Sequence, residues 1–191
     1  HVMLIPQYES LGHAGAQLSH PEMQDLRENG NHWVYCTNEP KVWEFLEAAF
    51  AELAEAFPNS NYIHVGGDEF EMAFGLCPQC KAIDDAEGSP AGSMLAFVND
   101  IAGRIEPEFP NVAVDTFAYQ YTRKPPKSIR PRPNVIVRLC SIECNFREPL
   151  DHPSNAAFLA DIEGWSKICR RLYIWDYTTD FANYVLPHPN W

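Results

Sequence analysis

The chain has 191 residues, of which 46% are hydrophobic and 21% are charged, a balance that is ordinary for one globular domain with a sizeable core. Its net charge of −12 argues against a nucleic-acid-binding protein, which normally carries a basic patch. No run of residues approaches the ~20 apolar residues that a membrane span needs. The aromatic share of 13% suits a large core or a site that stacks against sugar rings.

Short apolar runs alternate with amphipathic stretches along the chain. The helices are recognised by apolar residues at three- and four-residue spacing, and the strands by continuous apolar runs, which are typical of strands covered on both faces. The predicted strands are residues 2–5, 62–65, 112–117, 135–140 and 172–175, and the predicted helices are residues 39–57, 89–109 and 154–169.

The first of these helices has the clearest ends. Thr37 or Asn38 is the expected N-cap, because a short polar side chain accepts a hydrogen bond from the first turn. Pro40 suits that first turn, where its missing N–H would have no partner anyway. Pro58 and Asn59 are expected to end the helix.

This alternation predicts an α/β fold with a parallel sheet, either open or as part of a (β/α)8 barrel. Polar residues favour the barrel, because they follow the predicted strands at the end where such barrels hold their catalytic groups. A full barrel needs ~250 residues, so we expect residues 1–191 to be a single fragment of a (β/α)8 domain that lacks N- and C-terminal strands. The polar residues in question are Gln7, Glu9, His13, Asp68, Glu69, Tyr119, Gln120, Glu143, Asn145, Asp176 and Tyr177.

The six residues 64–69, His-Val-Gly-Gly-Asp-Glu, are the most informative segment. Two glycines let the backbone leave the strand sharply, so that Asp68 and Glu69 can point at one ligand. Adjacent carboxylates repel when both are ionised, and one therefore tends to hold its proton near neutral pH. A proton donor beside an anion is the equipment for breaking a glycosidic bond.

Six cysteines leave the redox state open. The pairs Cys77/Cys80 and Cys140/Cys144 are weak candidates for a four-thiolate zinc site, because the spacing within each pair is acceptable but the gap between the pairs is long. The alternatives are a disulfide involving Cys77 and Cys80, or free thiols in a fold already held by its core.

The chain resembles two families of glycoside hydrolases. In family 20 β-hexosaminidases one strand ends in Ile-Pro-Glu and Gly-His and the next carries His-x-Gly-Gly-Asp-Glu, a pattern that residues 5–13 and 64–69 match. Residues 138–144 and 172–184 are similar to the domain that defines family 163, a group of bacterial endo-β-N-acetylglucosaminidases acting on N-glycans. Gln7 stands where family 20 has a glutamate, a difference that bears on exo specificity more than on mechanism.

Both resemblances imply substrate-assisted retention, in which the 2-acetamido oxygen of the substrate attacks the anomeric carbon. Carried over, Glu69 is the general acid and later the base for water, with a contribution of ~10²–10⁴ in rate. Asp68 would orient the acetamido N–H and stabilise its positive charge. This chemistry needs no metal, no cofactor and no enzyme nucleophile. The alternative interpretation of the acid pair is an acidic loop that caps the following helix.

Other residues are candidates for the substrate-binding site. His64 is expected to brace the acid pair or to be a core histidine, and His13 to line the pocket or simply to turn the chain. The resemblance to family 20 implies that Tyr177 hydrogen-bonds the acetamido carbonyl and that Trp175 walls the N-acetyl subsite, with barrel core as the alternative for both.

Three further polar residues, Glu143, Asn145 and Asp176, are expected to bind sugar hydroxyls or else to form a solvated strand end. The Pro-rich loop at residues 121–133 carries five basic residues. We expect this loop to be solvated, and an anion site for the sialic acid of a complex glycan is the alternative.

The sequence thus predicts a hydrolase of β-linked N-acetylglucosaminides, with endo action on glycoprotein N-glycans preferred over exo-hexosaminidase action. A glycan-binding barrel without turnover and a zinc-stapled structural domain are the rival hypotheses. The expected partner is a glycan or glycoprotein, with no nucleic acid. A secreted, periplasmic or cell-surface location follows from that substrate alone, and the oligomeric state is open.

Overall fold

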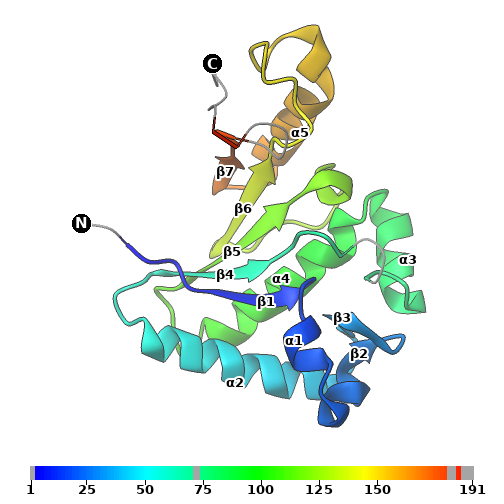
Figure 1. Cartoon of the computed structure of the whole chain (residues 1–191), viewed down its shortest axis with the longest axis vertical. Helices are drawn as coiled ribbons and strands as arrows, with labels where there is room; N and C mark the ends of the chain where they lie inside the picture. Colours follow the sequence, from blue (N-terminus) through cyan, green and yellow to red (C-terminus); the bar gives the residue numbers. More distant parts are fainter. Residues whose placement is uncertain (1–2, 71–73, 180–183, 186–191) are drawn as a thin grey trace.

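A computed structural model of the chain describes residues 3–70, 74–179 and 184–185. Its centre is a parallel five-stranded sheet in the order β1-β4-β5-β6-β7, so that the strands of this sheet lie side by side in the order in which they occur along the chain (Figure 1). This sequential parallel order is that of part of a (β/α)8 barrel. The strands are β1 (Gln7–Leu11), β4 (Tyr62–Gly66), β5 (Ala113–Ala118), β6 (Val135–Cys140) and β7 (Leu172–Trp175).

Helices α2 (Pro40–Ala56) and α4 (Ala91–Ile105) lie along one face of the sheet and pack on each other (Figure 1). Their apolar stripes meet alternate residues of the strands, which gives one continuous core. The third predicted helix begins as a 3₁₀ turn, η3 (Pro153–Asn155), and continues as α5 (Ala156–Ser166). In the described part of the chain, every helix is too short or too polar to cross a membrane.

Six elements have no counterpart in the sequence prediction. After β1 come the short helix α1, the 3₁₀ helix η1 and a hairpin of two antiparallel strands, and α3 lies between β4 and α4 (Figure 1). A 3₁₀ turn, η2 (Gln120–Thr122), also follows β5. The unpredicted elements are α1 (Gly15–Leu18), η1 (Pro21–Leu26), β2 (Arg27–Glu28) with β3 (Asn31–Tyr35), and α3 (Pro78–Glu87).

The prediction of a first strand at residues 2–5 is wrong. Residues 3–6 are not a strand, residue 2 lies outside the described residues, and Met3 and Leu4 are more than half exposed. Parallel pairing with β4 begins only at Pro6, whose carbonyl accepts from the His64 N–H (2.9 Å). Gln7 and Glu9 therefore lie within β1 rather than after it, because an apolar run becomes a strand only where a partner strand is available.

The expected N-cap of α2 is also wrong, by one or two residues. Glu39 occupies that position, and its carboxylate accepts from the Lys41 N–H (3.3 Å), while Pro40 takes the first turn as expected. The other strands and helices agree with their predicted ranges to within a few residues at each end, which is the usual spread of such boundaries.

The sheet face opposite α2 and α4 is lined by polar and aromatic side chains. His64 and Asp115 are register partners on β4 and β5, and both are buried. The Arg138 guanidinium pairs with the Asp115 carboxylate at 2.6 Å. Together with Phe117 and Trp175 they line a hollow of about 310 Å³. This face corresponds to the interior of a barrel, and its upper end carries the candidate site.

Candidate functional site

The turn after β4 is possible only because two glycines occupy it. Gly66 and Gly67 have φ angles of +82° and +121°, which side chains rarely adopt. A Cβ on Gly67 would lie 2.6 Å from Oγ1 of Thr116 and 2.9 Å from the Phe117 carbonyl oxygen. The backbone therefore passes directly against β5, and this close passage delivers the next two residues to the rim.

His64 supports this turn from below. Its Nδ1 accepts the Gly66 N–H (3.1 Å), and its ring packs on Phe117 with centroids 4.2 Å apart. Burial, with a smaller effect of the Arg138 charge, lowers the pKa of His64 to about 3. The neutral ring thus braces the backbone that leads to the acid pair. His64 is both a buried histidine and a support for the acid pair, the two roles that the sequence left open.

His13 lies between the two carboxylates. Its Nε2 is 3.6 Å from Oδ2 of Asp68 and 3.4 Å from Oε2 of Glu69. His13 follows β1 with a φ of +54°, and a Cβ on Gly12 would lie only 2.3 Å from the Asp68 carbonyl oxygen. The turns after β1 and β4 therefore interlock, and the structure brings together three residues that the sequence placed in the site.

Asp68 is the more buried member of the acid pair, with its side chain 28% exposed against 55% for Glu69. Burial raises its pKa, while the neighbouring His13 opposes the rise. Oδ1 of Asp68 is buried and has no hydrogen-bond partner among the described residues. Such an oxygen is costly to leave unpaired, so the site has an acceptor position that a donor on a ligand would satisfy.

Glu9 lies beneath the same turn. Burial raises its pKa, and the Asp68 charge raises it further. Its Oε2 is buried without a partner in the described part of the chain, and a Cβ on Gly66 would lie 2.7 Å from it. Gln7 donates to the other oxygen of Glu9. Glu9 therefore lies at the floor of the acid cluster.

Sequence reasoning missed Trp33, which also reaches the acid pair. The Trp33 indole N–H donates to the Glu69 backbone carbonyl (2.7 Å), and its ring lies 4.8 Å from that of His13. Trp33 belongs to β3, which the sequence analysis did not predict. The available signal was Asn29-Gly30, the pair of residues that a two-residue hairpin turn prefers; both have positive φ, +46° and +75°.

Tyr177 and Cys140 approach the acid pair from the other side. The Tyr177 hydroxyl and the Cys140 thiol form a hydrogen bond, and both groups sense the charge of Asp68. Burial raises the pKa of both groups. Trp175 is 42% exposed, and its ring packs edge-on against Phe117, so it lines the hollow in the sheet rather than a closed core.

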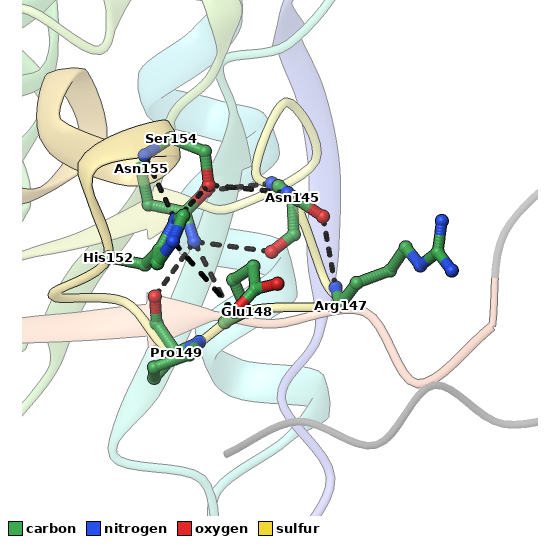
Figure 2. Close-up of polar contacts among 7 residues, drawn as sticks. All are labelled: Asn145, Arg147, Glu148, Pro149, His152, Ser154 and Asn155. Atoms are coloured by element: carbon green, nitrogen blue, oxygen red, sulfur yellow. Dashed lines mark hydrogen bonds and ion pairs between the residues drawn. The ribbon is translucent and has the colours of Figure 1, made fainter.

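The remaining candidates are held by protein partners. Glu143 pairs with Arg123 (2.8 Å), and one oxygen of Asp176 accepts from the Ser141 hydroxyl (2.6 Å). Figure 2 shows Asn145 in a loop organised by Asn155, whose side chain accepts from the Asn145 N–H (2.7 Å) and donates to three backbone carbonyls. The Asn145 side chain itself accepts from the N–H of Arg147.

The four cysteines that were weak candidates for a zinc site do not come together. Cys77 and Cys80 lie at the start of α3, where Asn38 donates to the Cys77 sulfur (3.0 Å), whereas Cys140 ends β6. Within residues 3–70, 74–179 and 184–185, no three His, Cys, Asp or Glu side chains are grouped to hold a metal ion. All six cysteines are free, so the alternative disulfide at Cys77 and Cys80 is not formed either.

The residues of this rim fall within one sequence family. The model of the family described as "Domain of unknown function (DUF4838)" matches residues 10–191. The chain belongs to this family. The match includes the whole rim from His13 to Tyr177, so the acid pair and the residues around it lie within the DUF4838 domain.

The DUF4838 domain also has the fold of solved β-hexosaminidases. It is similar to the GH20 β-N-acetylhexosaminidase from Streptomyces coelicolor A3(2), with a TM-score of 0.56 and 19% identity over 93% of this chain and 31% of that one. A mutant Streptomyces plicatus β-hexosaminidase in complex with GlcNAc matches with a TM-score of 0.61 and 17% identity, over 97% of this chain and 35% of that one. The β-N-acetylhexosaminidase from Bacteroides fragilis NCTC 9343 matches with a TM-score of 0.55 and 19% identity, over 86% of this chain and 29% of that one.

These similarities confirm the predicted α/β fold as part of a (β/α)8 barrel. The identities are low, so the comparison concerns the fold. The chain spans about a third of the length of each of these three structures.

Proposed function

We propose that this protein is a glycoside hydrolase that cleaves β-linked N-acetylglucosaminides with help from the substrate's own 2-acetamido group. The observation that carries the proposal is the acid pair after β4. Both carboxylates face His13, and Asp68 keeps a buried oxygen that lacks a partner among the described residues. An acetamido N–H is a donor that this oxygen would accept. The barrel fold shared with solved β-N-acetylhexosaminidases supports the same substrate class.

Each carboxylate then has one role. Glu69 gives its proton to the leaving oxygen as the glycosidic bond breaks, and the acetamido oxygen bonds to the anomeric carbon. The resulting oxazolinium ion carries a positive charge, which the Asp68 carboxylate stabilises while accepting its N–H. Glu69 next removes a proton from the water that attacks the anomeric carbon. The oxazolinium ring opens, and the sugar is released with its configuration retained.

The aromatic side of the site fits the acetamido group. The Tyr177 hydroxyl is held next to Cys140 and close to Asp68, where it can donate to the acetamido carbonyl. Trp175 and Phe117 provide an apolar wall beside it. His13, placed 3.4 Å from Glu69 and packed at a tilt against Trp33, orients the acid.

We further propose an endo mode on the N-glycans of glycoproteins. The similarity of residues 138–144 and 172–184 to family 163 supports this mode; residues 180–183 of that stretch lie outside the described residues. The chain would then be one part of a (β/α)8 catalytic domain. Glycoprotein substrates would place such an enzyme in the periplasm, on the cell surface or outside the cell.

The test is hydrolysis of a 4-nitrophenyl β-N-acetylglucosaminide and of a glycoprotein with complex N-glycans. The glutamine variant of the acid, Glu69→Gln, keeps the shape of the side chain but has no proton to give. On the glycoprotein, whose leaving oxygen must be protonated, we expect a loss of about 10²–10⁴ in kcat with the KM little changed. The matched control is Glu148→Gln, the same substitution at an exposed position in the loop after β6, which we expect to leave the rate unchanged.

The outcomes separate the alternatives. Release of intact glycan supports the endo mode, and release of single sugars supports exo action. If the wild-type protein binds N-glycans but cleaves neither substrate, it is a glycan-binding barrel. If Glu69→Gln cleaves as fast as Glu148→Gln, the acid is elsewhere.

A further inference from the structure

The peptide unit that follows Glu69 is held from both of its ends. Its carbonyl, on Glu69, accepts from the Trp33 indole N–H (2.7 Å), and its N–H, on Phe70, donates to the Tyr121 hydroxyl (3.3 Å). These two partners come from the hairpin after β1 and from the 3₁₀ turn after β5. A peptide plane gripped at its oxygen and at its nitrogen has a fixed orientation.

This grip matters because Glu69 has a φ of +49°. A non-glycine residue rarely adopts this left-handed conformation, and it persists only where the surroundings enforce it. The backbone at Glu69 decides the direction in which the carboxyl leaves the chain. Through its hydrogen bond to the Glu69 carbonyl, Trp33 therefore contacts the backbone that sets the direction of the acid.

Trp33 also positions the other neighbour of the acid. Its ring packs on the His13 ring, and its backbone carbonyl accepts the N–H of Ala14 (3.1 Å), the residue directly after His13. Trp33 thus contacts both members of the pair Glu69 and His13, whose Oε2 and Nε2 atoms lie 3.4 Å apart.

We propose that Trp33 is a positioning residue, which holds Glu69 in its left-handed conformation and sets the distance between Glu69 and His13. The proposal rests on the proposed function, since it assigns to Trp33 the aim of the general acid. Trp33 does not itself exchange a proton. Its contribution is to keep the acid within reach of the leaving oxygen, where a small misplacement has a large effect on rate.

The test is Trp33→Phe, which keeps an aromatic ring against His13 and removes the N–H donor. The matched control is Trp43→Phe. Trp43 lies on helix α2, away from the acid pair, and its indole also donates to a backbone carbonyl, that of Thr37 (3.0 Å). A second variant, Tyr121→Phe, removes the acceptor at the other end of the same peptide unit and keeps its ring on Phe70.

The readout compares two aryl glycosides that carry the same sugar part. A nitrophenolate leaves without protonation, whereas unsubstituted phenol needs the acid. We expect Trp33→Phe to lower kcat/KM on the phenyl glycoside about 10-fold, which is less than the ~10²–10⁴ that a whole general acid contributes. On the nitrophenyl glycoside we expect less than about a 2-fold change, since little proton transfer is needed there. Tyr121→Phe should change the ratio of the two rates in the same direction.

Each outcome has one meaning. If Trp33→Phe lowers both rates equally, or behaves like Trp43→Phe, Trp33 has only a structural role and the inference fails while the function stands. If the wild-type protein cleaves neither glycoside nor an N-glycan, the proposed function fails first, and the inference falls with it. Melting curves of both tryptophan variants identify any loss of rate that comes from unfolding.

Discussion

Polar side chains gather at two places along the same edge of the sheet, after β4 and after β6, and they differ in what they contact. After β4, Asp68 keeps a buried oxygen without a partner among the described residues, and Glu69 and His13 both have positive φ. After β6, Asn155 is 2% exposed, and both ends of its side-chain amide are hydrogen-bonded to backbone groups (Figure 2).

The difference separates a site that binds from a loop that is merely ordered. Buried polar groups in proteins are normally paired, so a fully paired cluster is explained by stability alone. The cluster after β4 combines a raised carboxyl pKa with strained backbone and an unsatisfied acceptor, which together indicate a functional site.

After the loss expected for Glu69→Gln, the largest effect is expected at Asp68. The substitution Asp68→Asn keeps the shape of the side chain but removes the negative charge that would stabilise the oxazolinium ion. We expect kcat on an N-acetylglucosaminide to fall about 10²–10³-fold, the usual cost of losing one preorganised electrostatic group. Steady-state kinetics on the nitrophenyl glycoside measures this, with Asp151→Asn in the exposed loop after β6 as the control.

A product analysis adds a second criterion. Since the acetamido group is the proposed nucleophile, the product released first by the wild-type protein should have the β configuration by NMR. An α product, or an Asp68→Asn variant with wild-type kcat, would contradict the assignment of Asp68.

The loop after β6 should respond in stability instead. Replacing Asn155 by alanine removes four hydrogen bonds and leaves three backbone carbonyls and one N–H without this partner. We expect the free energy of unfolding to fall by roughly 3 kcal/mol, given ~1–3 kcal/mol for each buried group left unpaired. Urea denaturation measures the change, and Asn59→Ala on an exposed turn is the control.

The kinetics of the folded Asn155→Ala variant then test whether the loop after β6 takes part in substrate binding. We expect kcat and KM to stay at wild-type values below the melting temperature. A raised KM would show that the loop carrying Asn145 binds substrate, as the sequence analysis expected, and would remove the contrast between the two groups.

The fold was readable from the sequence where local pattern and partner strand agree. Residues 135–140 and 172–175 form strands over the full predicted ranges, because each is a short apolar run between loop residues. Residues 2–5 are equally apolar and fail, since the parallel ladder with β4 starts at Pro6. Periodicity detects a surface that can be buried but not the strand that buries it.

The site was readable only in part, for a related reason. Asp68, Glu69 and His13 stand in recognisable motifs, and the structure brings them together. Trp33 stands in none, because its role depends on a hairpin that folds over the end of β1 and on one indole hydrogen bond to a distant carbonyl. Long-range contacts of this kind carry no local signature beyond the turn residues Asn29-Gly30.

The smallest predicted effect concerns His64 and depends on pH. Its folded pKa of about 3 lies below the ordinary value of 6.5, so the unfolded chain binds a proton that the folded chain does not. Stability from the neutral ring is therefore fully present above pH 6.5 and is lost as pH falls toward 3. Asparagine at this position can still accept the Gly66 N–H through its side-chain oxygen and does not titrate.

We expect His64→Asn to be the less stable protein at pH 7, because it loses the ring contact with Phe117. Between pH 7 and pH 5.5 the difference in unfolding free energy should narrow by about 1 kcal/mol, since only the wild-type histidine gains a proton on unfolding. Urea titrations of both proteins at the two pH values measure this. A difference that stays constant would mean that His64 binds a proton as readily in the folded chain as in the unfolded one. The histidine beneath the acid pair would then carry a charge at pH 5.5, and the contrast with Asn155 in the loop after β6 would rest on electrostatics rather than on an unpaired acceptor.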